Sequence, residues 1–135
     1  MKKPFVTLEQ AKKIMEQYPA PFHIYDEKGI RENAKKVRQA FSWNKGFKEY
    51  FAVKALPNPS VLRLLHSLGC GTDCASVTEV LLAQKCGITG KEIMFSSNET
   101  TEIEYRTALE AGAIINLDDV THIEYLETLG PLPDT

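Results

Sequence analysis

The sequence lacks the features that would direct it to a membrane or to nucleic acid. Its N-terminus, MKKPFVTLEQAKK, has no signal-peptide core, and no apolar run approaches the ~20 residues that a membrane helix needs. The formal net charge is only -2, and acids and bases are spread along the chain without a block of one sign. Neither nucleic acid nor an anionic membrane is therefore an expected partner, and we expect a soluble cytoplasmic protein.

Cysteine is also scarce. Cys70, Cys74 and Cys86 are odd in number, so they do not form a disulfide framework, and no histidine stands beside them to complete a zinc site. We expect reduced, mostly buried thiols. The histidines, His23, His66 and His122, show no metal-ligand spacing either, and no metal site is predicted.

Residues 1–47 are predicted to form a lead-in of helix, strand and helix. The first helix, from Thr7 to Tyr18, opens with a capping box and has an apolar stripe. The Pro19-Ala20-Pro21 sequence breaks it, and the aromatic segment from Phe22 to Tyr25 favours a short strand. A second helix is indicated by apolar residues at helical spacing, namely Ile30, Ala34, Val37 and Phe41.

Residues 48–135 are predicted to hold four consecutive β/α units, because short apolar runs alternate with helical patterns at a repeat of roughly 20 residues. The predicted strands are Tyr50 to Val53, Gly71 to Ala75, Ile93 to Ser96 and Ala113 to Leu117. Helix starts are marked by Asn58-Pro59 and by the pairs Ser76 and Glu79, Thr101 and Glu104, and Thr121 and Glu124. Helix ends are marked by Gly69, Gly87 and Gly112.

Consecutive β/α units build a parallel sheet, and two α/β architectures compete for it. One is a complete doubly wound domain of the flavodoxin or receiver type, which the chain length favours. The other is the first half of a (β/α)8 TIM-type barrel, which normally needs about 250 residues, so that this chain would supply about four of the eight strands.

Lys54 is the first candidate for chemistry, because it ends the first predicted barrel strand, and ligands of parallel α/β folds collect at the carboxyl ends of the strands. A partly desolvated ammonium there would have a lowered pKa and could attack an aldehyde. The alternative is a lysine that only extends into solvent from the strand end. Position alone does not decide between them.

The segment FAVKALPNPSVLRLL, from Phe51, resembles the cofactor-lysine motif of the pyridoxal-phosphate decarboxylases that act on ornithine, arginine and diaminopimelate. GTDCASVTEV, from Gly71, resembles the second-strand motif of the same family, in the right order and at the right distance. PFHIYD, from Pro21, and the segment from Glu92 to Leu126 are similar to further parts of that family. The resemblance covers nearly the whole chain and favours the barrel over the doubly wound domain.

The resemblance implies roles for individual residues. Lys54 would be the Schiff-base lysine for pyridoxal 5'-phosphate, and Asp73 and Glu79 would lie near the cofactor. Glu79 has an alternative reading, because its spacing from Ser76 is itself that of a helix cap. In the family that the sequence resembles, many diaminopimelate decarboxylases have a glycine-asparagine-asparagine-lysine loop after the third strand. This sequence has SSNE at that place, from Ser96 to Glu99.

The resemblance further implies an amino-acid decarboxylase that is a homodimer, with meso-diaminopimelate as the expected substrate. Ornithine, arginine or carboxynorspermidine decarboxylation and a non-catalytic cofactor-binding role remain alternatives. No glycine-rich phosphate loop is present, and the phosphate-binding, acid-base and substrate-reading residues are expected beyond Thr135 or from a partner subunit. We therefore expect this polypeptide alone to bind the cofactor weakly and not to turn over.

Overall fold

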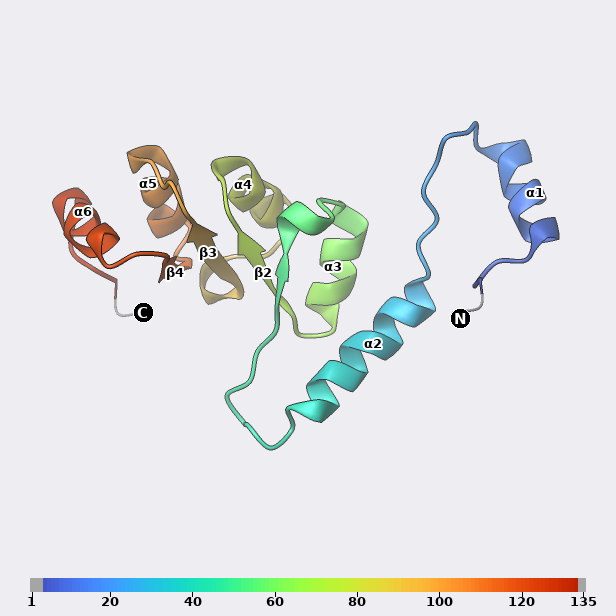
Figure 1. Cartoon of the computed structure of the whole chain (residues 1–135), viewed down its shortest axis with the longest axis horizontal. Coiled ribbons are helices and arrows are strands. Elements are labelled where there is room, and N and C mark those ends of the chain that lie inside the picture. Colours follow the sequence, from blue (N-terminus) through green and yellow to red (C-terminus); the bar gives the residue numbers. More distant parts are fainter. Residues whose placement is uncertain (1–3, 134–135) are drawn as a thin grey trace.

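A computed structural model describes residues 4–133 and shows helices and parallel strands in regular alternation (Figure 1). The helices are α1 (Leu8–Gln17), α2 (Glu27–Ala40), α3 (Pro59–Ser67), α4 (Val77–Lys85), α5 (Glu102–Glu110) and α6 (Thr121–Leu129). The strands are β1 (Tyr50–Ala52), β2 (Gly71–Cys74), β3 (Ile93–Ser97) and β4 (Ile114–Leu117). Two short 3-10 turns, η1 (Val53–Ala55) and η2 (Gly90–Glu92), follow β1 and precede β3.

The strand order separates the two architectures. All pairings are parallel, and the order in the sheet is β1-β2-β3-β4, the same as in the chain. A doubly wound sheet reverses direction at a switch point, so its spatial order departs from the chain order. Each strand here is followed by a helix, α3 to α6, and Figure 1 shows these helices in the same succession as the strands. The predicted four β/α units of a barrel are confirmed.

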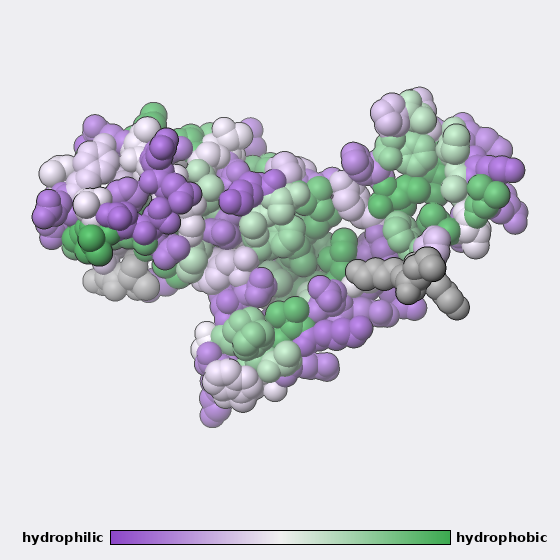
Figure 2. All heavy atoms as spheres, in the orientation of Figure 1, coloured by the Kyte–Doolittle hydropathy of each residue, from purple (hydrophilic) through white to green (hydrophobic). Residues whose placement is uncertain are grey.

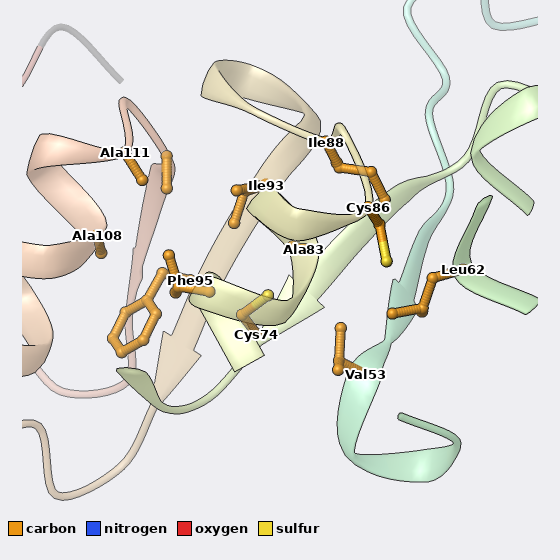
Figure 3. Close-up of a cluster of buried hydrophobic side chains, with 12 residues drawn as sticks. Val53, Leu62, Cys74, Ala83, Cys86, Ile88, Ile93, Phe95, Ala108 and Ala111 are labelled. Atoms are coloured by element: carbon orange, nitrogen blue, oxygen red, sulfur yellow. The ribbon is translucent and has the colours of Figure 1, made fainter. Parts of the chain in front are cut away.

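The core lies between the strands and the helices that follow them. Cys74 on β2, Phe95 on β3 and Val53, directly after β1, are fully buried there, as expected for side chains that point to one face of a pleated sheet (Figure 3). Helices contribute small and branched side chains to the same cluster, chiefly Leu62, Val80, Ala83 and Ala108. Small residues on the helices let them approach the sheet closely.

The intervening strand residues form a second row on the opposite face. Ala52, Asp73, Met94 and Ile114 are paired in register across the sheet, and each is only half-buried. In a closed barrel this row faces the interior. The carboxyl ends of the same strands therefore define the mouth where a ligand site is expected.

Most predicted helix starts are found. Asn58 caps α3 with Pro59 in its first turn, and Thr101 forms a capping box with Glu104. The helix start predicted at the capping-box pair Thr121 and Glu124 is wrong in its cap. Helix α6 begins at Thr121, Val120 is at the cap position, and these residues form no capping box. Its first turn is held by Asp119, whose Oδ1 accepts hydrogen bonds from the Thr121 backbone N–H at 2.8 Å and hydroxyl at 2.7 Å.

In its described part, residues 4–47, the lead-in contains both predicted helices and no strand. The segment from Phe22 to Tyr25 is neither helix nor strand, because no other strand within residues 4–133 lies beside it to pair with its backbone. The division at residues 47 and 48 stays a prediction. Helix α1 has the expected capping box at Thr7 but buries none of its residues. Figure 2 shows hydrophobic atoms on its surface, in keeping with the exposure of Leu8 and Tyr18.

Gly71 offers a test of how closely β1 and β2 approach η2. A Cβ built on this residue would lie 2.6 Å from the Glu92 carbonyl oxygen and 2.6 Å from the Tyr50 ring. Because backbone cannot move aside cheaply, we expect Gly71→Ala to lower the free energy of unfolding by about 1–3 kcal/mol in a urea titration.

Gly87→Ala is the matched control. Its φ is +84°, but nothing lies within 4 Å of the added Cβ, so only backbone strain of about 1–2 kcal/mol is expected. A Gly71→Ala variant as stable as the unsubstituted chain would show that the two strands do not pack as described.

Candidate active site

A polar hollow lies at the carboxyl ends of all four strands. Its volume is about 140 Å³, below the roughly 300–1,000 Å³ of a complete small-molecule site. Residues 4–133 therefore form part of a binding site rather than an enclosed one. The lining residues are Lys54, Asp73, Ala75, Ser96, Ser97, Asn98, Asn116 and Asp118.

Lys54 lies in η1, directly after β1, and its side chain lines the hollow. Strand β1 ends at Ala52, one residue before the predicted end, so the lysine is carried by a turn rather than by the strand itself. The residue is exposed, which corrects the expectation of partial desolvation. It nevertheless lies at the mouth of the sheet and shares the hollow with Asp73, as the sequence predicted.

Asp73 has a buried atom that lacks a partner. It belongs to β2, and its Oδ1 is buried without any hydrogen bond within the described part of the chain. Burying a carboxylate oxygen without a donor is costly, so this geometry suits a site where a ligand or an amine supplies the hydrogen bond. The unpaired Oδ1 of Asp73 could therefore accept a hydrogen bond from a positively charged group in the hollow beside Lys54.

Glu79 does not line the hollow. It lies in the first turn of α4, and its Oε2 accepts a hydrogen bond of 2.7 Å from the Ala75 backbone N–H. Ser76 caps the same helix, because its Oγ accepts from the Glu79 N–H at 3.3 Å. In a regular capping box the Glu79 carboxylate would accept from the Ser76 N–H, whereas here it accepts from the N–H one residue earlier, that of Ala75. Glu79 therefore holds the backbone of Ala75, which does line the hollow.

Five lining residues on β3, β4 and the loops after them were not singled out from the sequence as site residues. Asn116 Nδ2 donates to Ser96 Oγ at 3.1 Å, and Asn98 Nδ2 donates to Asp118 Oδ2 at 3.0 Å. The rule that located Lys54 applies to them equally, because they also stand at the carboxyl ends of parallel strands. Their polar character after apolar strand residues was the available signal.

The remaining reactive side chains lie elsewhere. All three cysteines are buried free thiols, as predicted, and burial raises the pKa of Cys74 to about 12. A neutral thiol facing the helix-side core offers no nucleophile to the hollow. Among residues 4–133, no cluster of potential ligands could hold a metal ion, and no helix is long and apolar enough to cross a membrane.

The fold and the site together define a class: a parallel β/α barrel wall with an amine and a carboxylate at its mouth. Within this class, residues 27–134 match the family described as "Pyridoxal-dependent decarboxylase, pyridoxal binding domain". The chain belongs to this family, and the resemblance found in the two sequence motifs is confirmed.

Characterised relatives agree with this assignment. The chain is 47% identical over 112 residues to protein TabA of Pseudomonas amygdali pv. tabaci, covering 83% of this chain and 26% of that protein. It is 35% identical over 119 residues to a diaminopimelate decarboxylase of Campylobacter jejuni, covering 87% of this chain and 29% of that enzyme. The chain thus spans between a quarter and a third of these relatives.

Solved structures show the same architecture. The diaminopimelate decarboxylase of Helicobacter pylori, complexed with L-lysine, has a TM-score of 0.77 at 30% identity over 88% of this chain and 30% of its own. The lysine decarboxylase of Selenomonas ruminantium has a TM-score of 0.85 at 22% identity over 96% of this chain and 34% of its own. At that identity the second likeness concerns the fold alone.

Proposed function

We propose that this chain is the part of a pyridoxal-phosphate-dependent amino-acid decarboxylase that supplies the cofactor lysine. The observation that carries the proposal is the hollow in which Lys54 and the unpaired Oδ1 of Asp73 stand together, in a chain of this family. An amine that can condense with an aldehyde needs a nearby acid or base for the transferred protons. Both groups are at the mouth of the same sheet.

Each chain residue has a distinct part in this proposal. Lys54 would hold the cofactor through its Nζ, and Asp73 would accept a hydrogen bond or a proton from a nitrogen in the hollow. Glu79 acts through the backbone, because its carboxylate fixes Ala75 at the floor of the site. When bound, pyridoxal phosphate supplies the electron sink that stabilises the charge left by carbon dioxide.

The described residues fit the amine end of the cofactor and not its phosphate. Gly69, Gly87 and Gly112 have positive φ, but they end helices and do not form one cradle of backbone amides. Together with the exposure of Lys54, this supports the expectation that the chain alone binds the cofactor weakly and does not turn over. Within residues 4–133 the sheet edges at β1 and β4 each have one strand neighbour, as in a partial barrel whose remaining strands would pair with them. For the whole enzyme we propose a homodimer, which the family resemblance implies.

For the substrate we propose meso-diaminopimelate, because several relatives at 29–35% identity are diaminopimelate decarboxylases. Ser96 to Glu99 differ from the loop found in many such enzymes, so decarboxylation of lysine, ornithine, arginine or carboxynorspermidine remains the alternative.

The substrate is tested by carbon dioxide release. A longer polypeptide that carries this segment, saturated with pyridoxal phosphate, is offered meso-diaminopimelate, L-lysine, L-ornithine and L-arginine, each labelled at the carboxyl carbon. We expect meso-diaminopimelate to give at least ~10-fold the specificity constant of the others, since a site built to pair its distal carboxylate rejects amino acids that lack this group. Equal release from L-ornithine would overturn the substrate assignment, and the 135-residue chain is expected to release none.

A second candidate is a non-catalytic cofactor-binding role. The exposure of Lys54 favours it, because an amine in contact with bulk water is not protected for catalysis. The same assay separates the two, since a cofactor-loaded protein that releases carbon dioxide from none of the four amino acids would support this role.

A further inference from the structure

Ser96 and Asn116 form a register pair at the mouth of the sheet. They are paired across β3 and β4. Ser96 follows Met94 by two residues, and Asn116 follows Ile114 by two residues. Met94 and Ile114 belong to the row of strand residues that faces the interior of a closed barrel. Side chains two residues apart in a strand point to the same face. Ser96 and Asn116 therefore lie on the face of Asp73, one layer closer to the mouth, and both line the hollow with Lys54.

Ala75 makes this pair accessible from the side of Lys54. It follows Asp73 by two residues and comes directly after β2, which lies between β1 and β3. Adjacent strands are about 4.8 Å apart, so β1 and β3 are separated by about 10 Å, and a large side chain on the intervening strand would fill that space. The methyl group of Ala75 leaves it open, and the Glu79 carboxylate holds the Ala75 backbone in place at 2.7 Å.

The hydrogen bonding of the pair leaves capacity for a ligand. Asn116 Nδ2 donates to Ser96 Oγ at 3.1 Å. The serine hydroxyl hydrogen and Asn116 Oδ1 have no other hydrogen-bond partner within residues 4–133. The wall therefore presents one donor and one acceptor to the hollow.

A second hydrogen bond continues this wall of the hollow beyond the strand ends. Asn98 Nδ2 donates to Asp118 Oδ2 at 3.0 Å, and these two residues follow Ser96 and Asn116 by two positions each. The bond joins the loops that leave β3 and β4. Because it lies beyond the last register pair, Ser97 and Leu117, it continues the β3–β4 connection where backbone pairing ends.

We propose that Ser96 and Asn116 contact the molecule that condenses with Lys54, and that the bond between Asn98 and Asp118 positions them. Ser96 and Asn116 are then binding residues, whereas Asn98 and Asp118 act through them. The inference rests on the proposed function, because it takes Lys54 as the residue that holds the aldehyde.

The test measures cofactor capture at Lys54 in the 135-residue chain. The amine and the aldehyde of pyridoxal phosphate condense with loss of water, borohydride supplies hydride and a proton follows, and the stable secondary amine is quantified on the Lys54 peptide against cofactor concentration. We expect Ser96→Ala and Asn116→Ala each to raise the half-saturating concentration about 3- to 10-fold, the value of one hydrogen bond. Pyridoxal, which lacks the phosphate, should show the same ratio, because the contact is not to the phosphate.

The positioning pair is tested by exchange. Asn98→Asp places two carboxylates together and should weaken capture about 3- to 10-fold, whereas the double variant Asn98→Asp with Asp118→Asn restores an amide-carboxylate bond and should recover it. Glu99→Gln, an exposed change in the same loop outside the hollow, is the control. Circular dichroism melts of every variant report whether a loss of capture follows from unfolding.

Each outcome bears on one claim. Preferential capture at Lys54 that Ser96→Ala and Asn116→Ala leave unchanged would overturn this inference and leave the proposed function standing. Capture without preference for Lys54 in the unsubstituted chain would overturn both. Failure of the exchanged pair to recover capture, with an unchanged melt, would overturn the positioning role of Asn98 and Asp118.

Discussion

Lys54→Ala is expected to weaken pyridoxal phosphate binding by roughly 100-fold or more, because it removes the only covalent link that the proposal assigns to the cofactor. Since Lys54 is exposed, its removal should leave the fold intact, and the melting temperature should not change. Binding is followed as the rise in visible absorbance during titration with the cofactor. A binding curve that Lys54→Ala leaves unchanged would remove the lysine from the site.

Two further variants sharpen this result. Lys54→Arg keeps the positive charge but lacks an amine that condenses with an aldehyde, so it should lose the absorbance as Lys54→Ala does. Lys85→Ala removes an exposed lysine from the last turn of α4, far from the lining residues of the hollow, and should bind as the unsubstituted chain does. Equal losses in both alanine variants would indicate a nonspecific effect of charge.

Phe95→Ala is expected to have the largest effect on stability. Phe95 lies in β3 with 0% of its surface exposed, between strand and helices and beside the Tyr105 ring at a centroid distance of 6.5 Å. Truncating such a ring costs about 3–5 kcal/mol through lost burial and the cavity left behind. Because a small domain is stable by only ~5–15 kcal/mol, the urea midpoint should fall steeply.

Ile103→Ala is the control for this measurement. Ile103 is 66% exposed on α5, so its truncation should change the free energy of unfolding by no more than about 0.5 kcal/mol. If Phe95→Ala were equally mild, the described core could not be the one that holds the sheet and helices together.

Much of the fold was predictable because local signals and global arrangement agree. The period-two strands, the caps at Asn58 and Thr101 and the glycines after helices specify β/α units without knowledge of tertiary contacts. Their order in the sheet follows from short right-handed connections. The strand predicted from Phe22 to Tyr25 failed because strand formation requires a partner, which side-chain propensity does not supply.

Side-chain burial was harder to predict at single positions. Leu81 directly follows the buried Val80 in α4 but is 47% exposed, because a helix turns by about 100° per residue and only positions three or four apart share a face. Leu62 shows the reverse, since it is buried together with Val61 although the two residues are adjacent in α3. Both follow from the angle at which a helix meets the sheet, which the sequence pattern does not specify.

The site was predictable to the extent that it depends on strand ends. Lys54 and Asp73 were located by that rule and by the family resemblance, and the structure brings them to one hollow. The exposure of Lys54 was not predictable, because burial depends on which elements cover the mouth. The pair Ser96 and Asn116 required the strand register, which brings together residues 20 positions apart.

The central claim is that Lys54 is the residue that receives the cofactor, and peptide mapping after borohydride trapping tests it most directly. The chain is mixed with pyridoxal phosphate below saturation, reduced, digested and analysed by mass spectrometry. We predict that the label is concentrated on the peptide that contains Lys54, ahead of other exposed lysines such as Lys85. Label spread evenly over the exposed lysines, or absent from Lys54, would contradict the account.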